Sequence, residues 1–227
     1  MKRMSIEPGI ENDKLYRLMG SRPGRDIPRA LARRVKQQTK IIDDLLSPWL
    51  TYATRPIQAV SDNAVYIADL PTIKSRRIAN TLRGCTHAVA FLATIGEDIS
   101  EAVDELSEEN HMSDAYIMDS MGSVAVEDLV DQFHRRIERK NLDKGRSVTI
   151  RFSPGYCDWD ITEQRKLFML FEQHNPRVTL TSSCLMEPRK SISGLFGILP
   201  FDNGMPVSKY VPCRDCGKKD CIARRGG

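Results

Sequence analysis

Apolar residues recur at helical spacing in several parts of the 227-residue chain. Between Pro28 and Leu50 they recur at this spacing among charged residues, which predicts an amphipathic helix. A longer series over residues 113–139 draws a single apolar stripe and predicts the core helix: Ala115, Met118, Gly122, Ala125, Leu129, Phe133 and Ile137. Shorter helices are predicted over residues 75–82, 97–108 and 162–173.

Other segments have the patterns of strands. Residues 87–95 form a continuous apolar run that is short and β-prone enough to be a buried strand. Further strands are predicted on both sides of a turn within 57–70, and over 147–152, 178–185 and 191–199. Helices and strands are interspersed without the regular βα alternation of a parallel sheet, so we expect an α+β fold with a mainly antiparallel, twisted sheet. One domain over 1–206 and a Cys-rich basic tail over 207–227 are expected.

Composition limits the class of protein. Apolar residues make up 41% of the chain and charged residues 28%, as in an ordinary globular protein. No window approaches the roughly 20 apolar residues of a membrane span, and no export signal is visible, so a cytoplasmic location is expected. A net charge of +4 is too small to imply a nucleic-acid partner. The sequence does not indicate an oligomeric state.

The charge is unevenly distributed along the chain. Residues 1–55 carry twelve Lys/Arg against six Asp/Glu, and residues 209–227 carry six against two. Between Arg83 and Arg135 there is no Lys or Arg, while residues 97–131 hold twelve Asp/Glu. This acidic stretch is either a solvated helical face or a docking surface that steers a basic partner.

Arg151 stands at the end of a predicted strand, directly before the turn residues Pro154-Gly155-Tyr156. A guanidinium offers a carboxylate two parallel hydrogen bonds, and a glycine lets a ligand approach the backbone closely. These residues therefore suit a small anion site. The alternative is an ordinary strand-end turn in which Arg151 pairs with a carboxylate of the protein surface.

Several short motifs, taken together, resemble the activation domain of cobalamin-dependent methionine synthase over roughly residues 15–200. In order and spacing the agreement covers Leu82-Arg83-Gly84-Cys85, Leu92-Ala93-Thr94-Ile95-Gly96, Asp119 to Glu127, Arg151-Phe152-Ser153-Pro154-Gly155-Tyr156, Leu180-Thr181 through Met186 and Pro188, and Ser191-Ile192-Ser193-Gly194. The upstream motifs look like those of the short, free-standing members of the family.

That domain binds S-adenosylmethionine, and the resemblance implies a role for each matching residue. Arg151 falls on the family's ligand arginine, which suits the carboxylate of the methionine moiety. Glu127 falls on a glutamate placed to meet the ligand's amino group. The backbone around Ser153 and Gly155, with Tyr156, would line the adenosine end. A second ligand tyrosine corresponds to Tyr210.

The resemblance also implies a function. In the family, methyl transfer from S-adenosylmethionine pulls forward the reduction of cobalamin that has slipped into its inactive cob(II) state. Since no corrinoid-binding or folate-binding module is visible in the chain, the resemblance implies action on a corrinoid protein partner. Two departures are visible: residues 1–55 offer no counterpart of an aspartate that touches the ligand in the large domain, and Ser182 stands where a glutamate is usual.

Three thiols in the basic tail form a separate candidate site. Cys213, Cys216 and Cys221 lie within nine residues and would suit zinc or an iron–sulfur cluster. Either Cys157 or Cys184 would supply the fourth ligand, or an iron would keep an open position. The alternative interpretation is that these three cysteines are free thiols. If they bind metal, the rival function is a metal or iron–sulfur accessory protein that donates electrons to a corrinoid enzyme or acts as a scaffold.

Overall fold

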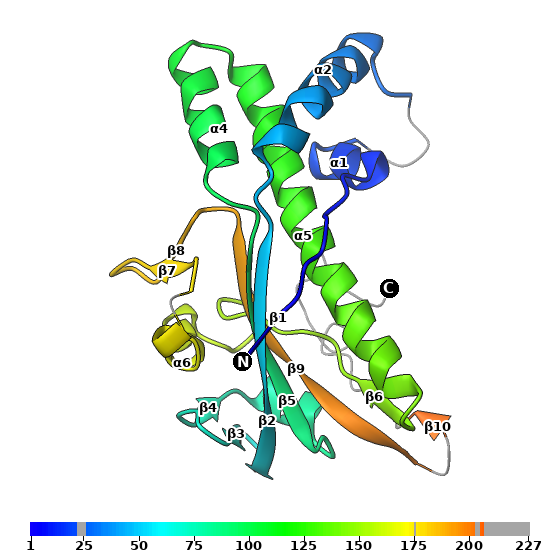
Figure 1. Cartoon of the computed structure of the whole chain (residues 1–227), viewed down its shortest axis with the longest axis vertical. Coiled ribbons are helices and arrows are strands. Elements are labelled where there is room, and N and C mark those ends of the chain that lie inside the picture. The colour runs from blue at the N-terminus through cyan, green and yellow to red at the C-terminus, as the bar shows by residue number, and fades with distance from the viewer. Residues whose placement is uncertain (22–25, 175, 203–204, 207–227) are drawn as a thin grey trace.

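The computed structural model describes residues 1–21, 26–174, 176–202, 205 and 206. In this part of the chain, helices pack on both faces of a long, twisted sheet (Figure 1). The helices are α1 Asn12–Leu18, α2 Arg29–Leu45, α3 Arg76–Leu82, α4 Asp98–Glu108, α5 Met112–Leu142 and α6 Gln164–Met169, with 3-10 turns at Ile161–Glu163 and Glu172–His174. The strands are β1 Lys2–Arg3, β2 Trp49–Val60, β3 Ala64–Ile67, β4 Ile73–Lys74, β5 His87–Thr94, β6 Arg146–Val148, β7 Thr179–Leu180, β8 Met186–Glu187, β9 Ser191–Asp202 and β10 Met205–Pro206.

The sheet is built around β5. Its strand order is β10-β9-β5-β2-β3-β4, with β1 added to β2 and β6 added to β9. β5 pairs along its whole length with β2 on one side and with β9 on the other. These pairings are antiparallel, as are the others in the sheet. The predicted α+β class with a mainly antiparallel sheet is confirmed.

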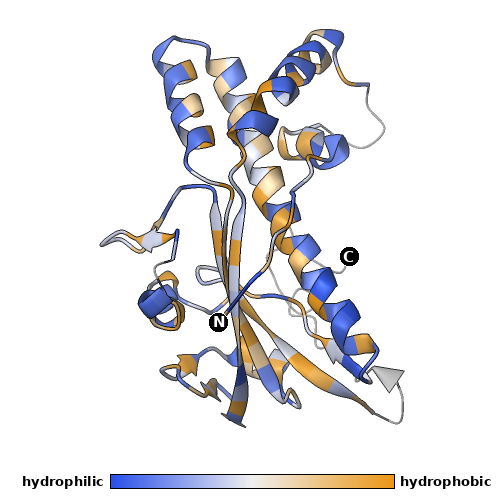
Figure 2. Cartoon of the chain, in the orientation of Figure 1, coloured by the Kyte–Doolittle hydropathy of each residue, from blue (hydrophilic) through white to orange (hydrophobic). Residues whose placement is uncertain are grey.

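The continuous apolar run of β5 reflects burial on both faces of the sheet. Alternate residues point to opposite sides of a strand, so each face receives its own set. Val89, Phe91 and Ala93 pack with α5, while Ala88, Ala90 and Leu92 pack with α3 and α6. Figure 2 shows the apolar residues along the central strands and along α5, among hydrophilic residues on the helices. Two apolar clusters therefore sandwich the sheet.

α5 is the core helix that the apolar stripe predicts. Every residue of the predicted stripe is buried, and the helix extends the predicted span by a few residues at its ends. It runs diagonally across one face of the sheet, and α4 packs against its first half (Figure 1). Glu127 lies away from this stripe, and its side chain is 52% exposed. The core therefore does not need this carboxylate.

The helix predicted between Pro28 and Leu50 ends earlier in the structure. α2 stops at Leu45, and Trp49 begins β2, the strand next to β5. Pro48 disfavours helical backbone at Ser47. The Ser47 N–H instead donates to the Ile95 carbonyl at 2.8 Å, which leads the chain into the sheet. The prediction was wrong for the last residues of the helix, and it missed residues 49–56, the first two-thirds of β2.

Two predicted elements of the second half are divided in the structure. Residues 178–185 form no single strand, because β7 and β8 pair as a small hairpin across the intervening turn. The helix predicted over 162–173 is α6 with a 3-10 turn on each side. In the described residues, no helix is both long and apolar enough to cross a membrane.

Candidate functional site

The segment from Arg151 to Tyr156 crosses close to β9. Phe152 and Leu195 exchange two backbone hydrogen bonds of 2.8 and 2.9 Å. This close approach requires a glycine on β9, because a Cβ at Gly194 would lie 2.4 Å from the Phe152 carbonyl oxygen. The chain then turns at Gly155, whose φ of +88° favours glycine. The predicted turn is therefore present, but the strand predicted over 147–152 ends at Val148, and beyond it only Phe152 bridges to β9.

Arg151 is the central charge beside this turn. Its side chain is only 4% exposed, and a buried guanidinium requires charged partners. One of its nitrogens donates to Glu127, and the other donates to Asp131 at 2.7 Å. Both carboxylates come from α5, one turn apart. Without a ligand, Arg151 therefore pairs with carboxylates of the protein, which is the alternative that the sequence left open.

A pocket of about 360 Å³ opens between Glu127, the turn and the start of β9. Its volume lies in the range of small-molecule sites, roughly 300–1,000 Å³. The lining is mixed, with polar side chains among apolar ones: Glu127, Ser153, Pro154, Tyr156, Ile161, Gln164, Cys184, Leu185, Met186, Arg189, Ser191, Ile192 and Ser193.

Buried polar groups fix one wall of this pocket. The side chain of Gln164 accepts a 2.8 Å hydrogen bond from the Ser193 hydroxyl and donates one of 3.0 Å to the Cys184 carbonyl. Gln164 thereby ties α6 to β9 and to the turn between β7 and β8. Arg189 also lines the pocket and pairs with Asp104 of α4 at 2.8 Å. Sequence reasoning missed Gln164 and Arg189, because nothing local distinguishes them from other helix and loop residues.

Hydrogen bonds of two aspartates anchor the loop that follows Gly155. Asp158 accepts hydrogen bonds from the Ser75 hydroxyl at 2.7 Å and from the Arg76 N–H at 2.9 Å, so it is tied to the start of α3. Asp160 accepts from both the side chain and the backbone N–H of Thr162. The side-chain hydrogen bond, and then the backbone one, lowers the pKa of Asp160 because both favour the charged form.

The structure brings together three of the residues predicted for ligand binding. Glu127, Ser153 and Tyr156 line the same pocket, and Arg151 lies behind Glu127. Gly155 is in the turn, where the position of a Cβ faces Ile161 at 3.2 Å, and it is not in the lining. Tyr210 lies outside the described residues, and so do Cys213, Cys216 and Cys221.

The described residues contain no group of three or more His, Cys, Asp or Glu that could hold a metal ion. Cys157 is exposed, whereas Cys184 is buried and lines the pocket. The metal site predicted at the C-terminal cysteines stays a prediction.

Much of the acidic stretch is paired inside the chain. Four carboxylates face basic residues from distant segments: Asp104 with Arg189, Asp114 with Arg34, Asp119 with Lys190, and Asp131 with Lys14. Asp128 faces Arg135 on the same helix. The asymmetric charge blocks of the sequence thus partly neutralise one another when the chain folds. A docking role for the stretch would depend on the carboxylates that remain exposed.

Comparison with known protein families identifies the family of this chain. Residues 75–221 match the family described as vitamin B12 dependent methionine synthase, activation domain. The chain belongs to this activation-domain family. The matched segment includes every residue that lines the pocket. The elements β1, α1, α2, β2, β3 and β4 precede it.

The fold agrees with this family membership. The chain is similar to a solved structure described as the MetH reactivation domain bound to AdoHcy, with a TM-score of 0.62 and 18% sequence identity. The match covers 92% of this chain and 80% of that one. A comparison with curated proteins returned no match. At this identity the likeness shows that the two chains share the activation-domain fold.

Proposed function

We propose that this activation-domain protein binds S-adenosylmethionine in the pocket beside Glu127 and supports reductive methylation of cobalamin on a corrinoid protein partner. The observation that carries the proposal is the pocket itself. It has a suitable size, a carboxylate in its lining and a buried arginine directly behind that carboxylate. The family membership and the AdoHcy named for the similar structure indicate which ligand to test.

The two ends of S-adenosylmethionine call for different surroundings. Its amino acid end is a zwitterion, which the adjacent charges of Glu127 and Arg151 complement. Its adenosine end is flat and partly apolar, and Tyr156, Ile161 and Ile192 supply apolar lining in the same pocket. Binding at the zwitterionic end requires an exchange, because Arg151 and Glu127 pair with each other before the ligand arrives.

The chain's contribution to the reaction is then positional. Bound S-adenosylmethionine would supply an activated methyl group to the partner's reduced cobalamin, leaving AdoHcy in the pocket, with the electron supplied by an external one-electron reductant. The chain holds the ligand in one orientation, and this lowers the entropic part of the barrier. None of the pocket residues has to act as a general acid or base in this scheme.

Calorimetric titration with AdoHcy and S-adenosylmethionine tests the proposal. Glu127→Gln should weaken both by about 10-fold, the lower end of the range for charge-assisted hydrogen bonds, because the ligand replaces an existing ion pair. Glu138→Gln is a matched control, since it removes a carboxylate about 16 Å further along the same helix and outside the pocket lining. Unchanged affinity in Glu127→Gln, or no binding to the wild-type protein, would contradict the proposal.

A further inference from the structure

The two carboxylates that hold Arg151 have different surroundings. Glu127 lines the pocket, and its side chain is 52% exposed. Asp131 does not line the pocket, and it is held from two sides. One of its oxygens accepts from Arg151 at 2.7 Å, while the other lies 3.8 Å from the Lys14 ammonium. Glu127 is therefore placed to exchange Arg151 for a ligand, whereas Asp131 is placed to keep it.

We infer that Asp131 is a positioning residue of the ligand site, which holds the Arg151 guanidinium in place while Glu127 changes partner. The inference rests on the proposed function and concerns the zwitterionic end of the ligand. When the ligand's ammonium takes Glu127 and its carboxylate takes Arg151, the guanidinium keeps Asp131. Arg151 then never becomes an unpaired buried charge, a state that is strongly unfavourable.

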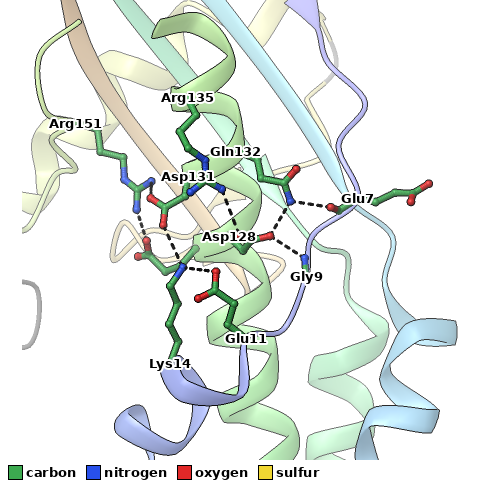
Figure 3. Close-up of polar contacts among 10 residues, drawn as sticks. Glu7, Gly9, Glu11, Lys14, Asp128, Asp131, Gln132, Arg135 and Arg151 are labelled. Atoms are coloured by element: carbon green, nitrogen blue, oxygen red, sulfur yellow. Dashed lines mark hydrogen bonds and ion pairs between the residues drawn. The ribbon is translucent and has the colours of Figure 1, made fainter. Parts of the chain in front are cut away.

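Lys14 links this arrangement to the start of the chain. It belongs to α1, in the segment of residues 1–18 that we call the N-terminal arm (Figure 3). Further polar contacts fasten the arm along α5: the Gly9 N–H to Asp128 at 2.7 Å, Gln132 to the Glu7 carbonyl at 2.9 Å, and Arg136 to the Ser5 carbonyl at 3.0 Å.

Apolar burial anchors the arm as well. Ile6 and Leu15 are 3% and 0% exposed and belong to the cluster between α5 and the sheet. The arm precedes the family-matched segment, which begins at residue 75. A residue outside the matched segment would therefore affect the ligand site, because Lys14 contacts Asp131 and Asp131 in turn contacts Arg151.

Charge and geometry predict opposite effects of losing Asp131. Removing a negative charge beside Arg151 favours the ligand's carboxylate, whereas removing the oxygen acceptor lets the guanidinium turn fully towards Glu127. We expect geometry to dominate, because a guanidinium with one carboxylate left can pair with it through both nitrogens, which withdraws Glu127 from the pocket. Asparagine separates the two effects, since it keeps an oxygen acceptor and loses the charge.

The test compares Asp131→Ala and Asp131→Asn by calorimetry with two ligands. AdoHcy has the amino acid end, and 5′-methylthioadenosine lacks it. We expect Asp131→Ala to bind AdoHcy about 10-fold more weakly than the wild type, and Asp131→Asn to stay within about three-fold. Both variants should bind 5′-methylthioadenosine like the wild type. Thermal melting of each variant checks that it is folded.

Lys14→Met completes the series. The exposed ion pair of Lys14 is worth at most about five-fold in affinity, and this effect should disappear in the Asp131→Ala background if Lys14 acts through Asp131. Asp128→Asn is the matched control, because Asp128 also fastens the arm to α5, and its polar contacts in the described part of the chain are with Gly9, Gln132 and Arg135 rather than with Arg151. It should leave AdoHcy affinity unchanged.

Several results would overturn the inference. They are a folded Asp131→Ala variant that binds AdoHcy as tightly as the wild type, an Asp131→Asn variant as weak as Asp131→Ala, or equal weakening of both ligands. If the wild-type protein binds AdoHcy and these results are found, only the positioning role fails. If the wild-type protein binds no AdoHcy, the proposed function is wrong, and this inference, which rests on it, is wrong as well.

Discussion

Gly194→Ala should damage both the fold and the pocket, because β9 has no room for a side chain at this position. A Cβ there would lie 2.4 Å from the Phe152 carbonyl oxygen and 2.9 Å from Cζ of Phe91. The first of these neighbours is backbone and cannot rotate away. An ordinary contact would require Phe152 to retreat by about 1 Å, which strains the two hydrogen bonds that it makes with Leu195.

Overpacking of this kind costs about 2 kcal/mol of the free energy of unfolding. For a chain of this length, that lowers the melting temperature by roughly 4–8 °C. Phe152 stands between Arg151 and Ser153, so its displacement also moves the charge behind the pocket and one residue of its lining. We therefore expect AdoHcy affinity to fall about 10-fold, equivalent to one charge-assisted hydrogen bond.

Gly197→Ala provides a control on the same strand. A Cβ at Gly197 would lie 2.5 Å from the Cys85 sulfur and 2.6 Å from a Leu82 methyl group, so this variant should also be destabilised. Its clash points towards α3 and away from the pocket, and it should bind AdoHcy like the wild type. Melting curves measure the loss of stability in both variants, and calorimetry measures their affinity for AdoHcy. An unshifted melting temperature for Gly194→Ala, or equal loss of affinity in both variants, would refute the reasoning.

Two further predictions concern the tail and the partner. If the C-terminal cysteines form one metal site, Cys216→Ser should lose most of the metal found in the anaerobically purified wild-type protein, since two thiolates and water bind far more weakly than three thiolates; equal metal content in the two proteins would count against the site. Association with a corrinoid protein should weaken as salt rises if exposed charges contribute to docking, because screening acts over about 10 Å at 0.1 M ionic strength. A pull-down that is equally efficient at low and high salt would contradict that contribution.

The internal pairing of the acidic stretch limits the size of the salt effect. Carboxylates such as Asp114 and Asp119 already face Arg34 and Lys190 within the chain. A partner would have to compete with these contacts or use the remaining exposed carboxylates. The charged residues therefore also hold α2 and the segment just before β9 to α4 and α5, which the sequence pattern alone did not reveal.

The sequence by itself determined the elements whose burial has a local period. The stripe on α5 and the doubly buried run of β5 could be recognised because a helix or a strand repeats its environment every few residues. The turn at Gly155 was also readable, since positive φ favours glycine. The family motifs drew attention to Glu127, Ser153 and Tyr156, which line one pocket in the structure.

The tertiary structure alone decided which distant residues meet. The first two-thirds of β2 was missed because its partners on β5 lie roughly 30 to 45 residues away along the chain, and because the start of the strand is buried on both faces like β5. Asp131, Gln164 and Lys14 carried no local signal, because a carboxylate, an amide or an ammonium on a helix is usually solvated. Their importance arises where the N-terminal arm packs on α5 and where α6 packs on β9, and long-range contacts of this kind have no sequence period.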